Sequence, residues 1–326
     1  MSNTIEKALL RQKEAERQKK EAELAASPTP SDQALEPQGA STENLAASDS
    51  DFDPDSGHIN TEKPDLRSRE NNKVSVSNAT QQFTEQHFEI DVADLEKRGF
   101  VSLHSTRKLI NEEYREIKRK LLSNAFGPLS KTLTNANIIM VTSARPSEGK
   151  TFTAINLALS IAAEQDKRVL LVDADVLKPN ILRTLGLESR SGLMEYLLGD
   201  VKEIGQIMFR SNIDKLRIIP AGRSHHLSTE LLASKAMNDL VTEFSNRYPD
   251  RVVIIDTPPI IGINESAILA NFAGQAVVVV EEGRSKLSDI QKAVERLNPE
   301  MAIGFVVNKS LNTSDQNSYY GYHYND

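Results

Sequence analysis

The sequence predicts an α/β fold, in which helices cover both faces of a mostly parallel β-sheet. Six apolar runs lie near residues 137, 168, 216, 251, 276 and 303, and amphipathic helical patterns separate most of them. The runs are continuously apolar rather than alternating, which indicates strands that are buried on both faces, as in a parallel sheet. A further helix is predicted over residues 105–123, where Leu109, Ile110, Tyr114, Ile117 and Leu121 recur at helical spacing.

Composition excludes several classes of protein. The chain has 326 residues, of which 39% are hydrophobic, so part of it is expected not to pack into a core. It has no cysteine, which excludes disulfides, zinc–thiolate sites and thiol catalysis. No stretch approaches the roughly 20 apolar residues that span a bilayer, and the N-terminus has no apolar signal core. We therefore expect a cytosolic protein.

The two ends of the chain are expected to lie outside the folded domain, which we place at residues 81–312. Residues 1–26 predict a helix that is either a solvated segment or a docking helix for a partner. Residues 27–80 carry ten acidic and four basic side chains among Ser, Pro, Asn and Thr, which predicts a disordered acidic linker. Most of the net charge of −7 lies there, so no global field favours nucleic acid. A flexible tail is predicted over 313–326.

The first chemical motif is ARPSEGKT, residues 144–151, which stands between a predicted strand and a predicted helix. Its spacing is that of the phosphate-binding P-loop, with Ala144 in place of the first glycine. Backbone N–H groups near the helix start can hold phosphate oxygens, Lys150 can reach the β- and γ-phosphates, and the Thr151 hydroxyl can bind magnesium. The predicted nucleotide-binding residues are Ser147, Glu148, Gly149, Lys150, Thr151, Phe152 and Asn308. The alternative is a Gly-Lys-Thr turn that arises by chance.

Two further motifs place aspartates at the ends of predicted strands. The run VLLVDADVLKP puts Asp173 and Asp175 at the end of an apolar strand, where they could bind magnesium or accept a proton from a hydroxyl. The alternative is an aspartate that caps a helix. The run VVIIDTPP has the Walker B pattern, in which Asp256 supports magnesium. Because parallel strands share a carboxyl edge, all three motifs are expected to meet there.

Asn308 follows another apolar strand and could recognise the edge of an adenine base through its amide. The alternative is a turn at the end of the strand.

The end of the sequence concentrates tyrosine. Four of the seven tyrosines lie in the last eight residues, at Tyr319, Tyr320, Tyr322 and Tyr324. The surrounding polar residues cannot form a core, so the segment is either an adhesive disordered end or a phosphate acceptor. Phosphorylation of several tyrosines would add strong mutual repulsion, which could separate subunits that hold one another's tails.

The four motifs ARPSEGKT, VDADVLKP, VVIIDTPP and YYGYHY resemble those of the bacterial tyrosine kinases of P-loop type. More narrowly, the chain resembles the exosortase-associated tyrosine autokinases of exopolysaccharide biosynthesis, whose opening is similar to NTIEKAL here. The resemblance covers residues 96–326 well and residues 1–15 loosely. It implies the P-loop NTPase fold of the deviant Walker, ParA- and MinD-like class.

The resemblance also implies roles for particular residues. Catalytic roles fall to Lys150, Asp173 and Asp175, and the metal site to Thr151, Asp173, Asp175 and Asp256. In this family Asp173 would deprotonate the acceptor tyrosine. The family's E-x-x-R-x-x-R motif, which contacts the next subunit, is matched by Glu112, Arg115 and Lys118, with lysine in the last place.

The function that the resemblance implies is an ATP- and magnesium-dependent autokinase that phosphorylates its C-terminal tyrosines in trans and regulates polysaccharide synthesis or export. The expected partners are further copies of the chain, in a ring or other homo-oligomer, and a membrane-bound chain-length or co-polymerase protein that supplies an activating segment. Such a partner would place the protein at the inner membrane. The alternatives are a ParA- or MinD-like switch ATPase and a nucleotide-binding scaffold without kinase activity.

Overall fold

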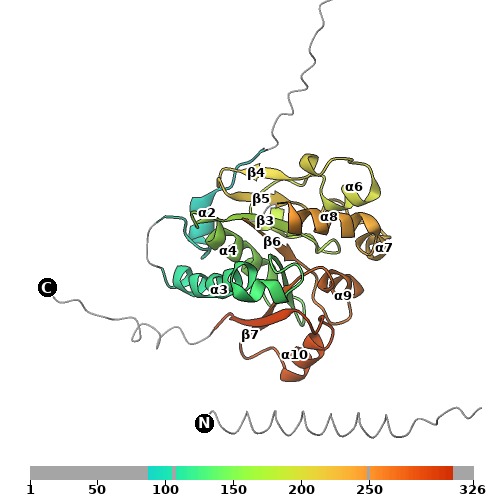
Figure 1. Ribbon diagram of the computed structural model, residues 1–326. Helices are drawn as coiled ribbons and strands as arrows, with labels where there is room; N and C mark the ends of the chain where they lie inside the picture. Colours follow the sequence, from blue (N-terminus) through green and yellow to red (C-terminus); the bar gives the residue numbers. More distant parts are fainter. Residues whose placement is uncertain (1–86, 105–107, 248–249, 311–326) are drawn as a thin grey trace, which may run out of the picture. The chain divides into compact units, whose positions relative to one another are not determined.

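The computed structural model of the protein describes residues 87–104, 108–247 and 250–310 (Figure 1). The predicted N-terminal helix, the acidic linker and the tyrosine-rich tail therefore lie outside the described residues. Within the part of the chain that is described, no helix is both long enough and apolar enough to cross a bilayer.

The described residues form one eight-stranded sheet with the order β1-β4-β5-β3-β6-β2-β7-β8. Neighbouring strands run parallel except for β4 and β5, which are antiparallel. The strands are β1 (His87–Phe88), β2 (Ile138–Ser143), β3 (Arg168–Asp173), β4 (Phe209–Ser211), β5 (Leu216–Ile219), β6 (Arg251–Asp256), β7 (Gln275–Glu281) and β8 (Ala302–Asn308).

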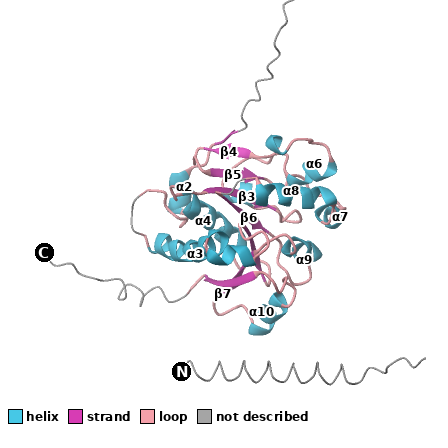
Figure 2. Ribbon diagram, in the orientation of Figure 1, coloured by secondary structure: helices cyan, strands magenta, loops and turns pink. Residues whose placement is uncertain are grey.

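Helices cover both faces of this sheet (Figures 1 and 2). One layer contains α2 (Val92–Lys97), α3 (Leu109–Phe126), α4 (Lys150–Ala162) and α5 (Ile181–Thr184). The other contains α6 (Leu193–Leu198), α7 (Ser228–Leu232), α8 (Lys235–Asn246), α9 (Asn264–Ala270) and α10 (Leu287–Val294). Two short 3₁₀ turns lie at Pro128–Thr132 and Ile204–Gln206.

Alternating side chains of each central strand enter two separate cores. In β2, Ile139 and Val141 pack under the α3–α4 layer, whereas Ile138 and Met140 pack under the opposite layer. Every residue of β2 and β6 is buried, so apolar side chains are needed on both faces of these strands. This explains the continuous apolar runs in the sequence.

The predicted fold class is confirmed, and all six predicted strands are present, as β2, β3, β5, β6, β7 and β8. The sequence did not predict β1 or β4, because strands of two and three residues carry too little pattern to be distinguished from loops. The predicted helix over 105–123 is observed as α3, which begins at Leu109 and continues to Phe126.

The order of the central strands determines where the site lies. β6 is between β3 and β2, and its last residue, Asp256, is paired with Asp173 of β3 and with Val141 of β2. The loops that follow these three neighbouring strands therefore leave the sheet at one edge, side by side.

Helix α3 is joined to α4 by a buried lysine. Lys118 is 7% exposed at its side chain, and its ammonium group lies 2.5 Å from Glu164 Oε1 and donates to the Ser160 carbonyl at 2.8 Å. The side chain predicted to contact a neighbouring subunit is thus engaged within its own chain.

We expect Lys118→Met to lower the free energy of unfolding by about 2 kcal/mol, because it removes a charged hydrogen bond and leaves Glu164 without this partner. Denaturant titration measures the loss. Lys120→Met makes the same chemical change at an exposed position two residues away and should alter stability by less than about 0.5 kcal/mol. Equal effects of the two substitutions would contradict a structural role for Lys118.

Candidate functional site

The loop between β2 and α4 has a backbone path that requires glycine at one position. Gly149 has a φ of 103°, and a Cβ atom there would lie 1.9 Å from Asn308 Nδ2. Both facts exclude larger residues from this position. Ser147 has a φ of 71°, so a second residue adopts the left-handed conformation without being glycine. The backbone therefore turns tightly before α4 begins at Lys150.

Glu148 holds the loop in place from its buried side chain. Its Oε2 accepts a hydrogen bond from the Arg145 backbone at 2.8 Å, and its Oε1 accepts one from the Ser285 hydroxyl. Its own carbonyl accepts a hydrogen bond from Asn308 Nδ2 at 2.9 Å. These contacts connect the loop to the segment after β7 and to the end of β8.

Two exposed cations join the loop to the same region. The Arg145 guanidinium binds both carboxylate oxygens of Asp289 on α10, at 2.6 and 3.1 Å. Lys309 Nζ donates to the Ser147 carbonyl at 2.8 Å and lies 3.0 Å from Glu281 Oε2. The loop is thus held on its β7–β8 side by several polar contacts.

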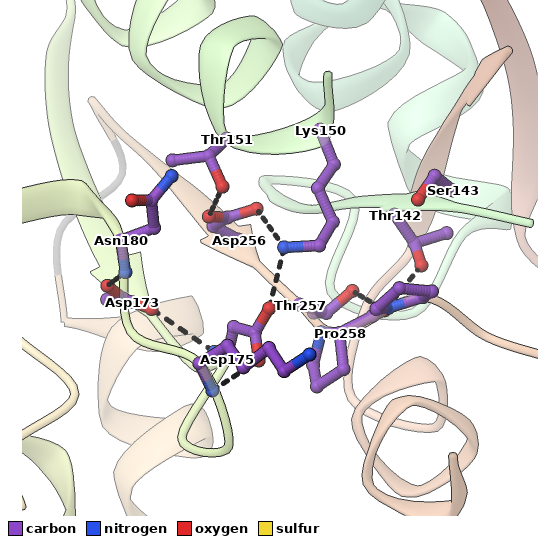
Figure 3. A network of polar contacts seen from close by, with 12 residues as sticks. Thr142, Ser143, Lys150, Thr151, Asp173, Asp175, Asn180, Asp256, Thr257 and Pro258 are labelled. Carbon is purple, nitrogen blue, oxygen red and sulfur yellow. Dashed lines mark hydrogen bonds and ion pairs between the residues drawn. The ribbon is translucent and has the colours of Figure 1, made fainter. Parts of the chain in front are cut away.

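On the other side of the loop, a lysine and a threonine face two aspartates (Figure 3). Lys150 Nζ lies 2.6 Å from Asp175 Oδ2 and 3.9 Å from Asp256 Oδ1. The Thr151 hydroxyl donates to Asp256 Oδ2 at 2.7 Å. The loop after β2, the loop after β3 and the end of β6 therefore meet at one cluster, as the sequence predicted.

Asp173 belongs to this cluster but is held by backbone donors. Its Oδ1 accepts from the Asp175 backbone at 3.2 Å, and its Oδ2 accepts from Asn180 and Ile181 at 3.1 and 3.0 Å. These bonds fix the short helix α5 and the loop before it against the end of β3. Asp173 thus orders the connection between β3 and α5, which is the alternative role for this residue. It also lies beside the other aspartates.

The cluster contains one cation and three carboxylates, all largely buried. Burial and the neighbouring charges of Asp256 and Asp175 raise the pKa of Asp173 to about 7, against the hydrogen bonds from Ile181 and Asn180. Burial also raises the pKa of Asp256 to about 6, although Lys150 and Thr151 oppose this shift. Burial lowers the pKa of Lys150, but the Asp256 and Asp175 carboxylates outweigh it and the net shift is upward. The cluster therefore favours any added positive charge.

The arrangement suits a cation that also has phosphate ligands. Asp256 Oδ1 is fully buried and has no hydrogen-bond partner among the described residues. Within the same described ranges, no three carboxylate or imidazole groups are close enough to hold a metal alone. Magnesium is typically bound by one or two carboxylates together with phosphate oxygens and water, so the residues fit a magnesium–nucleotide complex rather than an isolated metal site.

The structure brings together most of the predicted site residues. Lys150, Thr151, Asp173, Asp175 and Asp256 converge, and Ser147, Glu148 and Gly149 form the loop before α4. Asn308 contacts this loop through its amide, so the predicted recognition of adenine stays a prediction.

The predicted subunit contacts lie on α3, away from this cluster. Glu112 and Arg115 form an ion pair of 2.5 Å on the helix surface, whereas Lys118 is buried as described above. The predicted acceptor tyrosines lie outside the described residues.

A cleft of about 710 Å³ adjoins the cluster and includes residues that the sequence did not reveal. Arg98 and Phe100 line it from the segment after α2, and Arg183 and Thr184 line it from α5. The Phe100 and Phe152 rings contact each other with centroids 4.7 Å apart. No motif connects these positions, because the fold alone brings residue 98 to the P-loop.

Comparison with known proteins identifies the family. Residues 136–303 match the AAA domain family, which contains a P-loop. The chain is 33% identical over 228 residues to tyrosine-protein kinase YwqD of Bacillus subtilis, covering 69% of this chain and 92% of that protein. It belongs to the bacterial tyrosine-protein kinases. This kinase chain is also 36% identical over 188 residues to the putative tyrosine-protein kinase EpsB of Ralstonia nicotianae, where it spans 24% of the relative's length.

Solved structures share the fold of this chain. The kinase chain superposes on the chimerical protein CapA2B2 with a TM-score of 0.54 and 26% identity, covering 67% of this chain and 98% of that one. The kinase domain of Escherichia coli tyrosine kinase ETK shares the fold, with a TM-score of 0.53 and 24% identity over 69% of this chain and 91% of that domain.

The raised pKa values predict how stability depends on pH. A carboxyl group whose folded pKa exceeds its unfolded value of about 4 destabilises the protein increasingly as pH rises through that interval. For Asp256 the interval ends at about pH 6. We therefore expect the Tm of the nucleotide-free protein to fall as pH rises from 4.5 to 7.5. The Tm of the Asp256→Asn variant should fall less steeply over the same range.

Thermal unfolding at several pH values without magnesium measures both slopes. Asp214→Asn, at an exposed position, is the matched control and should follow the unsubstituted chain. Identical slopes for the unsubstituted chain and Asp256→Asn would show that the Asp256 carboxylate is not destabilised by its surroundings.

Proposed function

We propose that this chain binds ATP with magnesium and transfers the γ-phosphoryl group to its own C-terminal tyrosines, Tyr319, Tyr320, Tyr322 and Tyr324, mainly between subunits. The observation that carries the proposal is the convergence of Lys150 and Thr151 with Asp173, Asp175 and Asp256 at the carboxyl edge of three neighbouring strands. Membership in the bacterial tyrosine-protein kinases supports the reaction type.

Positioning and charge neutralisation account for most of the catalysis in such a reaction. Backbone N–H groups from Ser147 to Phe152 hold the phosphates at the start of α4, and Lys150 contacts the β- and γ-phosphates. Without nucleotide, the Lys150 ammonium group forms an ion pair with Asp175. Nucleotide binding would therefore require Lys150 to exchange Asp175 for the phosphates. Magnesium would neutralise phosphate charge when bound, and the residues that would hold it are Thr151, Asp173, Asp175 and Asp256.

Asp173 is the residue that we propose accepts the proton of the tyrosine hydroxyl. The phenol oxygen forms a bond to the γ-phosphorus, the bond between that phosphorus and the β–γ bridging oxygen breaks, and the proton passes to the Asp173 carboxylate. Burial and the neighbouring carboxylates raise its pKa, which makes it a stronger base than an exposed carboxylate. The three backbone hydrogen bonds to Asp173 fix its orientation.

We further propose a homo-oligomer, such as a ring, in which Glu112 and Arg115 on the surface of α3 contact the next subunit. Lys118 would influence this contact through the position of α3, because its side chain is buried. Phosphorylated tails repel one another, which would dissociate the assembly.

The names of the relatives EpsB and CpsD support a role in exopolysaccharide or capsule synthesis. The partner we propose is a membrane-bound chain-length or co-polymerase protein, which would supply an activating segment and recruit the kinase to the inner membrane.

A switch ATPase of the ParA or MinD type is the second candidate. Those proteins typically have a lysine at the position of Arg145. Here the Arg145 guanidinium is bound to Asp289 of its own α10, which favours the kinase. A scaffold without kinase activity is separated from the kinase only by measuring phosphoryl transfer.

Incubation of the purified full chain with ATP and magnesium should produce phosphotyrosine in the C-terminal peptide, and mass spectrometry identifies the modified positions. Lys150→Met should lower labelling by at least about 100-fold, because it removes a charge that stabilises the transferring phosphoryl group. Tyr→Phe substitution at all four C-terminal positions should abolish labelling of this peptide while nucleotide binding persists.

Mixing Lys150→Met protein with the four-fold Tyr→Phe variant tests transfer between subunits. Neither protein labels its own tail, so label on the Lys150→Met tail must come from the other copy. An unlabelled unsubstituted chain at high protein concentration would contradict the kinase proposal and leave the scaffold.

A further inference from the structure

The cleft beside the Lys150 cluster lies on one side of the P-loop. Its walls come from the P-loop and the start of α4, from the segment after β3, and from the segment after α2. Among the described residues that line it, none comes from the ends of β7 and β8, where Asn308 contacts the opposite side of the loop. The cleft thus lies on the side of Asp175, which lines it.

In-line phosphoryl transfer requires the acceptor oxygen to approach opposite the leaving oxygen. With the phosphates held by the P-loop, the side open to an acceptor is the one where Asp175 lines the cleft. The acceptor would therefore enter past Asp175. That path is the part of the cleft lined by Arg98, Phe100 and Arg183.

The walls of this part combine the partly exposed ring of Phe152 with cations, and the buried ring of Phe100 packs against Phe152. The Phe100 and Phe152 rings are inclined by 52°, and the Arg98 guanidinium lies 5.5 Å from the Phe100 centroid. Arg98 also pairs with Asp94 at 3.2 Å, but its side chain is 42% exposed. Arg183 also lines the cleft and is exposed, and its Nε donates to Asn180 Oδ1 at 2.9 Å. A phenol ring and neighbouring acidic groups match these walls.

We propose that this part of the cleft is the acceptor subsite, in which Phe152, with Phe100 packed against it, contacts the ring of the tyrosine, and Arg98 and Arg183 bind acidic side chains that flank it. The inference rests on the proposed kinase function and identifies its substrate determinants. The C-terminal segment has the required chemistry, because Asp315 and Asp326 flank its four clustered tyrosines. Arg98 and Arg183 are positioning residues, since they bind the acceptor and not the reacting atoms.

Equilibrium binding tests the subsite without phosphoryl transfer. A fluorescein-labelled peptide of residues 312–326 is titrated with full chain that carries Tyr→Ala at its own four C-terminal tyrosines, in the presence of magnesium and a non-hydrolysable ATP analogue. The double variant Arg98→Glu, Arg183→Glu should raise the peptide Kd at least about tenfold, since it reverses two charges. The Kd of the nucleotide analogue should change by less than about twofold.

Arg210→Glu is the matched control. Arg210 lines a separate polar cavity of about 670 Å³ near the first residues of β3 and β6, at the end of the sheet opposite the P-loop. Its substitution should leave peptide binding unchanged.

Peptide variants separate the two contributions. A Tyr→Phe peptide should bind as tightly as the original, because the ring is retained, whereas a Tyr→Ala peptide should bind at least about tenfold more weakly. A peptide with Asp→Asn at both aspartates should bind more weakly to the chain that retains Arg98 and Arg183. Its Kd should change little when these two arginines are replaced.

Two results would overturn the subsite: unchanged peptide affinity in the double arginine variant, or a loss of nucleotide affinity in place of peptide affinity. The second result would assign the cleft to the nucleotide. Failure of the kinase proposal is distinguishable, because it would appear as absent phosphotyrosine in a chain that still binds the peptide with these preferences.

Discussion

An imbalance of buried charge is the constraint on which this structure depends. Three aspartates and one lysine lie at the edge of a sheet where the fold excludes most water, and the Asp256 side chain is fully buried. Such an arrangement is costly for the folded protein by itself, because desolvated carboxylates repel one another. The raised pKa values of Asp173 and Asp256 express this cost. A bound cation removes it, so the same feature that destabilises the free protein favours a magnesium–nucleotide complex.

The rest of the fold holds this cluster rigid. The parallel register of β3, β6 and β2 sets Asp173 and Asp256 side by side. On one side of the P-loop, contacts from Ser285, Asn308 and Lys309 fix its backbone and exclude a side chain at Gly149. The other side is left open as a cleft. This asymmetry supports our proposal that the braced loop holds the nucleotide and that the acceptor approaches through the open side.

The sequence predicted the parts of the site that depend on local pattern. Continuous apolar runs mark the central strands because both faces of these strands are buried, and aspartates that follow such runs stand out. The same reasoning failed for β1 and β4, which are too short to carry a pattern. Lys118 shows another limit: a family motif suggested a surface contact, but whether a lysine is buried depends on Ser160 of a different helix and on Glu164, which follows that helix. Arg98 and Ser285 are remote from every motif, so only the folded chain places them at the site.

Calorimetric titration of the nucleotide-free protein with preformed magnesium–ADP at pH 6.5 tests the central claim most directly. If the buried carboxylates are made for a cation, binding must expel the protons they hold at this pH, and the observed heat will depend on the ionisation enthalpy of the buffer. We predict release of part of a proton or more per nucleotide bound, and a smaller release for Asp256→Asn. Heats that are the same in all buffers would show that no buried carboxylate changes its charge on binding, and would contradict the account.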